Sequence, residues 1–155
     1  MASHSPRELV FRRYLDAVGL HGMAGAEAAG LHASEWHALS LIELDGSLTA
    51  GELATRVGLT TGATTRLVDR LVRAGYVRRV ADPADRRKVL VEPVPDALAG
   101  VEELVGPARR RIADVLASYN PQELDVLFDY FARAAPAYRE ATREIREATG
   151  RARQA

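Results

Sequence analysis

The side chains that most clearly indicate a chemical function are basic, and they are concentrated in one segment. Between Thr55 and Lys88 the sequence holds nine Lys or Arg residues and three acidic residues, whereas the whole chain has 21 of each sign. Such a local excess of positive charge attracts a polyanion such as nucleic acid, whatever the overall pI. Because a charged run alone is commonly a solvated helix face, its meaning depends on the elements that carry it.

Other kinds of reactive site are not indicated. The chain has no Cys, so we expect no disulfide, no thiolate redox switch and no Cys-based zinc site. The four His residues have no metal-ligand spacing with carboxylates, and the sequence has neither a Gly-rich phosphate loop nor a nucleophile motif. We therefore predict that the protein is not an enzyme and holds neither a metal nor a cofactor.

Two short helices with strong end signals carry much of the positive charge. Thr49 and Glu52 form a capping box at the start of the first helix. Gly58 is expected to end this helix by adopting a left-handed conformation. Thr60 caps the second helix, predicted over residues 61–74. Two helices joined by a tight Gly-containing turn are typical of a helix-turn-helix.

The second of these helices is amphipathic, with arginine on its polar face. Apolar residues follow a helical spacing on one side, and Arg residues recur at i, i+4 and i+7 on the other. The two sets are Leu67, Val68, Leu71 and Ala74, and opposite them Arg66, Arg70 and Arg73. Because small polar residues in its first turn let a backbone approach bases closely, this helix is predicted to enter a DNA major groove.

A basic hairpin is predicted after the two helices. Residues 76–80 and 88–92 have strand-like alternation, and the segment 82–85 between them, Asp-Pro-Ala-Asp, has the residue types of a turn. The hairpin tip continues with Arg86, Arg87 and Lys88. A helix-turn-helix followed by such a ribbon is a winged helix-turn-helix. We therefore predict a mainly α fold with a small wing of two to three strands.

Helices are also predicted before the winged lobe. The first covers residues 7–29, and the glycines Gly19, Gly22 and Gly25 are expected to bend or fray its second half, since each costs about 1 kcal/mol relative to Ala. Ser34 is the expected N-cap of a second helix that ends near residue 44.

The pattern becomes helical again after the wing, from Asp96 onward. Gly106-Pro107 should kink or divide this helix, because proline lacks a backbone donor and crowds the preceding turn. The sequence Asn-Pro-Gln-Glu at 120–123 is a strong helix start, with a cap, a Pro at the first position and a Glu at the third.

With these elements in place, the chain resembles the multiple-antibiotic-resistance regulator (MarR) family. The matching residues are LTAGELA at 48–54, TRLVDRL at 65–71, AGYV at 74–77 and DPADRR at 82–87, followed by the apolar strand 89–91. The layout of the family covers nearly the whole chain, and residue-level matching is confined to about 39–93. One departure is Glu92-Pro-Val-Pro-Asp96, where the family commonly has a Leu-Thr pair and a Gly.

The resemblance implies a homodimer that binds double-stranded DNA at a pseudo-palindromic operator and acts as a repressor. Residues 1–33 and 96–155 would form a helical dimerisation platform, and residues 34–95 the winged helix-turn-helix lobe. It also implies that Arg87 enters the minor groove and that Asp85 braces this arginine. Arg66, Arg70, Arg73, Arg78 and Arg86 are expected to neutralise phosphates. The expected DNA-binding residues are Thr60, Thr61, Thr64, Thr65, Arg66, Arg70, Arg73, Arg78, Asp85, Arg86 and Arg87.

A small-molecule effector is a further implication of the resemblance. In the family, a cleft between the platform and the winged lobe often accepts small aromatic or phenolic anions. Tyr14, His21, Trp36 and His37 are the residues expected to line such a cleft, with His37 as the pH-sensitive or anion-facing group. The other interpretation is that Trp36 belongs to the core and His37 is an ordinary surface or interface residue.

Two further expectations follow from the sequence as a whole. No apolar run approaches the roughly 18 residues that a membrane span requires, and the N-terminus lacks the pattern of a secretory signal, so we expect a cytoplasmic protein with no membrane partner. The alternative function is a winged-helix module that binds proteins through its basic wing and has no direct role on DNA.

Overall fold

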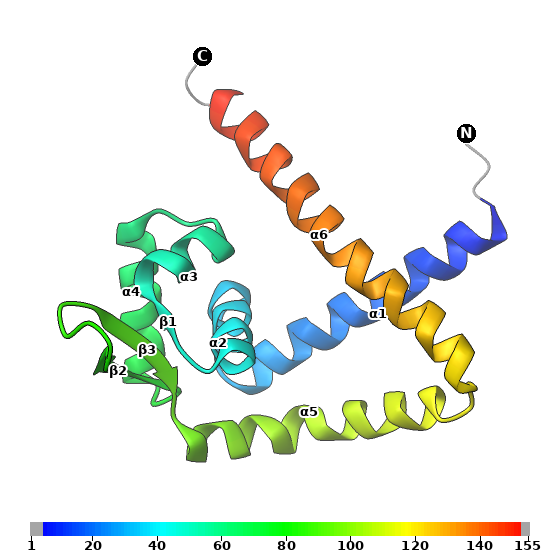
Figure 1. Ribbon diagram of the computed structural model, residues 1–155, viewed down its shortest axis with the longest axis horizontal. Coiled ribbons are helices and arrows are strands. Elements are labelled where there is room, and N and C mark those ends of the chain that lie inside the picture. Colours follow the sequence, from blue (N-terminus) through cyan, green and yellow to red (C-terminus); the bar gives the residue numbers. More distant parts are fainter. Residues whose placement is uncertain (1–4, 153–155) are drawn as a thin grey trace. The chain divides into compact units, whose positions relative to one another are not determined.

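The computed structural model describes residues 5–152 of the 155-residue chain. Helices dominate it, and three short strands form one small antiparallel sheet (Figure 1), which confirms the predicted fold class. No helix in this range is long and apolar enough to cross a membrane. In chain order the elements are α1 (Pro6–Ala28), α2 (Ala33–Asp45), β1 (Leu48–Thr49), α3 (Ala50–Val57), α4 (Thr61–Arg73), β2 (Val77–Ala81), β3 (Val89–Pro93), α5 (Pro95–Leu116) and α6 (Pro121–Ala152).

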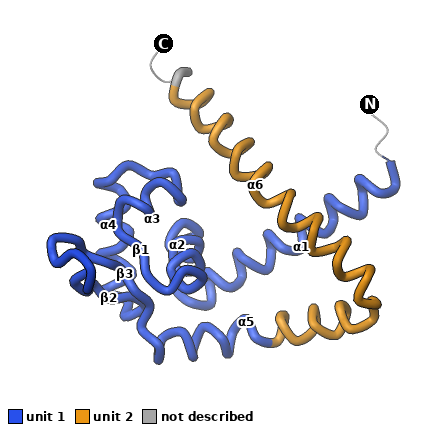
Figure 2. Tube along the Cα trace, in the orientation of Figure 1, with its two compact units in different colours: residues 1–106 blue, residues 107–155 orange. Residues whose placement is uncertain are grey.

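The chain forms two compact units, residues 1–106 and 107–155 (Figure 2). The boundary between them falls inside α5, at the Gly106-Pro107 pair. The sequence predicted that this pair would kink or divide the helix; a division is wrong, because α5 continues through Pro107 to Leu116. A proline removes only one backbone hydrogen bond, and buried Val101 and Val105 anchor the turns that precede it.

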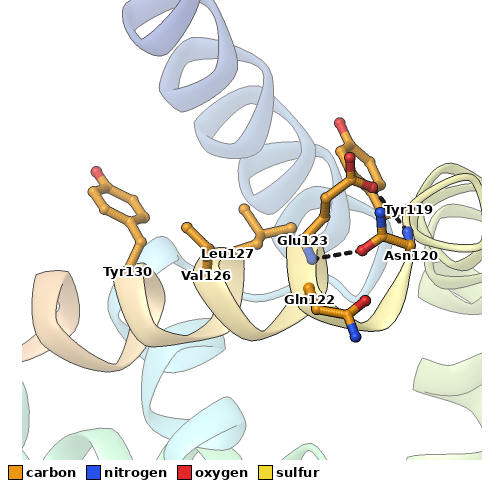
Figure 3. A pocket seen from close by; sticks show the side chains of 7 residues that line it. All are labelled: Tyr119, Asn120, Gln122, Glu123, Val126, Leu127 and Tyr130. Carbon is orange, nitrogen blue, oxygen red and sulfur yellow. Dashed lines mark hydrogen bonds between the residues drawn. The ribbon is translucent and has the colours of Figure 1, made fainter.

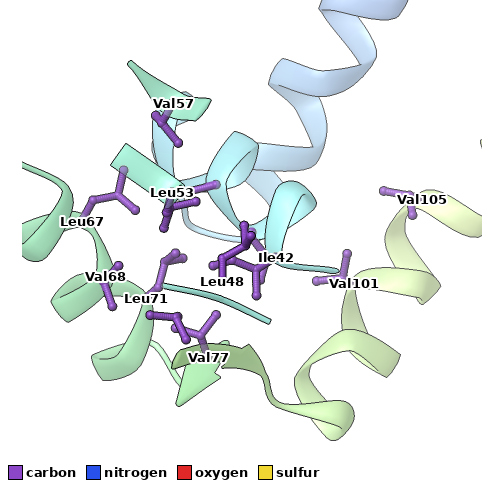
Figure 4. Packing of buried hydrophobic residues seen from close by; sticks show 13 residues of the cluster. Ile42, Leu48, Leu53, Val57, Leu67, Val68, Leu71, Val77, Val101 and Val105 are labelled. Atoms are coloured by element: carbon purple, nitrogen blue, oxygen red, sulfur yellow. The ribbon is translucent and has the colours of Figure 1, made fainter. Parts of the chain in front are cut away.

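The hydrophobic core lies in the first unit and is built where α2, α3 and α4 meet the sheet and the start of α5 (Figure 4). Its members come from one face of each amphipathic helix and from the inward positions of the strands. They are Ala38, Leu39, Ile42, Leu48, Leu53, Val57, Leu67, Val68, Leu71, Val77, Val91, Val101 and Val105. The core therefore fixes α4 and the wing strands to one scaffold.

The helix-turn-helix follows its sequence signals closely. The Thr49 backbone N–H donates to Glu52 Oε2 at 2.8 Å, so the predicted capping box is present. Gly58 ends α3 with φ of +69°, a left-handed conformation that suits a residue without a side chain. Thr60 caps α4, and its hydroxyl accepts from the Ala63 N–H at 3.3 Å.

The wing has three strands in the order β1-β3-β2, all antiparallel. The strands β2 and β3 lie one residue beyond the predicted ranges. The two-residue strand β1 pairs Leu48 with Val91. It was not predicted as a strand, because two residues carry no visible alternation.

The helices before the lobe differ from prediction in two respects. Helix α1 is continuous through Gly19 and Gly22 to Ala28, so its second half does not fray. The N-cap of α2 is His32 and the prediction of Ser34 is wrong. The physical reason is that Glu35 Oε2 accepts a hydrogen bond from the backbone N–H of His32 at 2.9 Å. This backbone donor lies one residue before α2 begins, and its bond with Glu35 completes the cap at that position.

Candidate DNA-binding surface

Helix α4, which is predicted to enter a DNA major groove, buries one face and exposes another. Leu67, Val68 and Leu71 are at most 1% exposed, and Thr64 lies on the same buried face. The hydroxyl of Thr64 donates to the Thr60 carbonyl at 3.0 Å. Thr64 was among the expected DNA-binding residues, and this expectation is wrong, because its side chain is enclosed by the core.

The exposed face of α4 carries the other predicted residues. Thr61, Thr65, Arg66 and Arg73 are all exposed. The Thr65 hydroxyl donates to the Thr61 carbonyl at 2.9 Å and remains on the surface. Within residues 5–152 no carboxylate forms an ion pair with Arg66 or Arg73. Two guanidinium groups of α4 thus face solvent without an acidic partner.

Two other predicted arginines hold carboxylates of the same chain. Arg70 pairs through Nε with Oε1 of buried Glu35 on α2. Arg78 on β2 pairs with Glu92 on β3 at 2.6 Å. An arginine already held by a carboxylate must break that ion pair to bind a phosphate. Arg70 and Arg78 therefore bind a phosphate less readily than Arg66 and Arg73, which have no such pair to break.

Two carboxylates accept hydrogen bonds at the wing tip, and Asp82 Oδ1 accepts one from the Ala84 N–H at 2.8 Å. Asp85 Oδ1 accepts hydrogen bonds from the backbone N–H of Arg87 at 3.1 Å and from its Nε at 3.2 Å. This is the contact that the family resemblance implied. The Arg87 side chain is still 92% exposed, so Asp85 aims the guanidinium without covering it. The neighbouring side chain of Arg86 is exposed as well.

The wing is tied to α4 by an ion pair that the sequence did not reveal. Arg79 Nη2 on β2 donates to Asp69 Oδ1 on α4 at 2.7 Å. The two residues are ten positions apart, and no local pattern indicates that they meet. This pair, together with the shared core, joins α4 and the wing to one scaffold.

The four predicted effector residues lie on two helices, Tyr14 and His21 on α1 and Trp36 and His37 on α2. Trp36 is half-buried and packs against the core, and Tyr14, His21 and His37 are exposed. No hydrogen bond or ring contact joins any two of them in the described part of the chain. An open hollow lies elsewhere, at the start of α6 (Figure 3), and is lined by Tyr119, Asn120, Gln122, Glu123, Val126, Leu127 and Tyr130.

Comparison with known proteins bears directly on this surface. The family model described as MarR family matches residues 31–89, which span the helix-turn-helix and most of the wing. The chain is 33% identical to the HTH-type transcriptional regulator YcgE of Bacillus subtilis over 138 residues, covering 89% of this chain and 90% of that protein. The chain belongs to the MarR family. It is thus one of a family of transcriptional regulators, as the sequence motifs indicated.

Solved structures of MarR-family proteins share the fold. A MarR-family protein from Bacillus stearothermophilus is 26% identical, with a TM-score of 0.62 over 88% of this chain and 98% of that one. The protein NadR, solved in complex with 4-hydroxyphenylacetate, is 20% identical, with a TM-score of 0.61 over 87% of this chain and 96% of that one. The second likeness shows the winged fold alone.

Proposed function

We propose that this protein is a homodimeric repressor that binds a pseudo-palindromic DNA operator. The observation that carries the proposal is the combination of an exposed arginine face on α4 with an exposed, carboxylate-braced Arg87 at the wing tip. Both features lie on one compact unit, so a single subunit offers DNA a helix for the major groove and a basic tip for the minor groove.

Within this proposal the contacts divide by chemistry. Thr61, Thr65 and Arg66 read base edges, because they lie on the exposed side of the first turns of α4. Arg73 and Arg86 bind phosphates, which gives affinity without sequence information. Thr60 supports the start of α4 as its cap. Arg87 prefers a narrow A·T-rich minor groove, where the negative potential is strongest.

The apolar side chains that the single chain leaves exposed support the proposal of a homodimer. Large hydrophobic residues on the terminal helices face solvent in both units, which is unusual for a monomer. They include Val10, Val18 and Met23 on α1, Ile112 and Val115 on α5, and Val126, Phe128 and Ile145 on α6. A symmetric dimer built from residues 1–33 and 96–155 would set the two recognition helices about 34 Å apart, one turn of DNA.

We also propose that a small aromatic or phenolic anion releases the protein from DNA. The support is that NadR, of the same fold, was solved with 4-hydroxyphenylacetate. Tyr14, His21 and His37 are the exposed candidates for such a ligand, and Trp36, the single Trp of the chain, directly precedes His37. Titration with salicylate tests this: quenching of Trp36 fluorescence together with weaker DNA binding supports an effector, and no change in either contradicts it.

A mobility-shift assay tests the main proposal. The probe is a duplex from the region upstream of the protein's own gene, and the competitor is a scrambled duplex of equal length and composition. We expect a retarded complex that the unlabelled upstream duplex removes and the scrambled duplex does not. Absence of a complex, or equal competition by both duplexes, would favour the protein-interaction module instead.

A further inference from the structure

Two polar contacts tie the C-terminal end of α4 to the junction between α1 and α2. Arg70, in the last turns of α4, pairs through Nε with Glu35 in the first turn of α2. Tyr76, just beyond α4, donates its hydroxyl to the carbonyl of Ala29 at 2.9 Å, where α1 ends. The contacts reach across 35 and 47 residues of sequence and converge on the same short junction.

Glu35 is unusual because it is a charged side chain inside the lobe. Its side chain is 4% exposed, and both carboxylate oxygens have donors, Arg70 on Oε1 and the His32 N–H on Oε2. Burial raises the pKa of Glu35, but the His32 hydrogen bond and the Arg70 guanidinium outweigh that effect and hold the pKa below 4.5. The carboxylate is therefore ionised at neutral pH and holds the arginine.

Compared with an apolar pair of similar size, an ion pair between buried Glu35 and the partly exposed Arg70 adds little to net stability. An apolar pair lacks the directional hydrogen bond of an ion pair. The Arg70 guanidinium meets the Glu35 carboxylate in only one register of α4 against α2. Arg70 is also less exposed than the wing-tip arginine, at 43% against 92% for Arg87. The geometry therefore suits a connection within the protein better than a contact with DNA.

We propose that Glu35, Arg70 and Tyr76 are positioning residues that set the orientation of α4 for sequence reading, and that Arg70 is not a phosphate ligand. The inference rests on the proposed DNA-binding function and deepens it. It places the control of α4 at the α1–α2 junction, so any movement of α1 is passed to the recognition helix through these two contacts.

The dimensions of α4 show why its anchoring matters. The helix has 13 residues, a length of about 20 Å, so a tilt of about 10° at its C-terminal end moves its first turn by about 3 Å. A shift of that size removes Thr61 and Arg66 from hydrogen-bonding distance of base edges. Contacts with phosphates are less demanding, so loss of the anchor should affect sequence preference more than general affinity for DNA.

The experiment compares binding to two duplexes over a range of salt concentrations. The specific probe is a duplex that the wild-type protein enriches from a random-sequence pool, and the reference is poly(dI-dC). The variants are Arg70→Gln and Tyr76→Phe, with Arg73→Gln as the control for an exposed arginine of the same helix. Circular dichroism and thermal unfolding establish that each variant folds. If Arg70→Gln does not fold, the test rests on Tyr76→Phe, which removes only a single hydroxyl.

We expect Arg70→Gln and Tyr76→Phe to weaken binding of the selected duplex about tenfold, with poly(dI-dC) binding and the salt dependence unchanged. Arg73→Gln should weaken both duplexes and reduce the slope of log K against log salt by about 0.9 for each phosphate that the variant no longer neutralises. The inference is overturned if Arg70→Gln behaves like Arg73→Gln, or if neither anchor variant alters binding of the selected duplex. If the wild type enriches no sequence at all, the proposed function itself fails and this inference with it.

Discussion

The indole ring of Trp36 lies directly against the backbone of Gly25. A Cβ atom at position 25 would be 2.8 Å from Cζ2 of Trp36, closer than real side-chain contacts allow. Gly25 is buried in α1 and Trp36 is half-buried in α2, so the absence of a side chain at position 25 lets the two helices approach. From sequence this glycine was expected only to weaken α1; its role as a contact surface for Trp36 needed the structure.

Gly25→Ala is therefore expected to destabilise the protein although alanine is the better helix former. The helix gains about 1 kcal/mol in propensity, while displacing the indole costs about 1–3 kcal/mol. The measurement is the midpoint of thermal unfolding, which should fall. Gly51→Ala is the control, because nothing lies within 4 Å of a Cβ at that position, and its midpoint should stay the same or rise. A higher midpoint for Gly25→Ala would contradict the packing described here.

Arg87→Ala is expected to weaken operator binding by about 1–3 kcal/mol, the range of a specific groove contact. Asp85→Asn should weaken it less, because the guanidinium remains but loses the carboxylate that holds it at 3.2 Å. The measurement is a binding isotherm by fluorescence anisotropy. Arg133→Ala, an exposed arginine of α6 outside the winged lobe, is the control and should bind as the wild type. An unchanged isotherm for Arg87→Ala removes the wing from the proposed mechanism.

The sequence predicted the winged lobe because its signals are local. The Thr49–Glu52 capping box, the left-handed Gly58 and the Thr60 cap each act within four residues, and all three are present in the structure. Helical periodicity predicted the arginine-rich face of α4. It did not predict the burial of Thr64, which was expected on the DNA-binding face.

Contacts between distant segments were beyond prediction. Glu35 carried one usable signal, since it stands three residues after His32 and so completes a cap, but nothing in the sequence connects it with Arg70. The same holds for Arg79 with Asp69. Ion pairs between separate elements depend on how helices and strands pack, and a charge pattern along one chain does not record that packing.

Ile112→Glu is expected to convert the proposed dimer to a monomer. Ile112 is 55% exposed on α5 in the single chain, and a buried carboxylate in an apolar interface is strongly unfavourable. Light scattering after size-exclusion chromatography measures the mass. Leu44→Glu is the control, since Leu44 is 81% exposed but lies at the end of α2 in the winged lobe. A dimeric mass for Ile112→Glu would place the interface elsewhere.

Ionisation of Glu35 is expected to make the free energy of unfolding depend on pH. Its pKa in the folded protein is below the ordinary value of 4.5, so its contribution is present above that value and is lost as the pH falls through the folded-state pKa. Urea unfolding of the wild type and of Glu35→Gln tests this. At pH 7 the variant should be less stable by about 1–3 kcal/mol, and the difference should shrink below pH 4.5. A difference that is constant between pH 7 and pH 3 would mean that ionisation of Glu35 plays no part.

Thr64 and Thr65 are neighbours with opposite surroundings, so their substitutions should separate folding from recognition. Thr64→Ala removes a buried methyl group and the hydrogen bond to the Thr60 carbonyl, and should lower the free energy of unfolding by about 1–2 kcal/mol while the operator preference stays the same. Thr65→Ala alters only an exposed side chain, so stability should change by less than about 0.5 kcal/mol. Its effect should appear in binding, as reduced discrimination at one base pair of each half-site when single-base operator variants are compared. The reverse pattern, with Thr64→Ala relaxing base preference in a stable protein, would mean that α4 meets DNA with a different face.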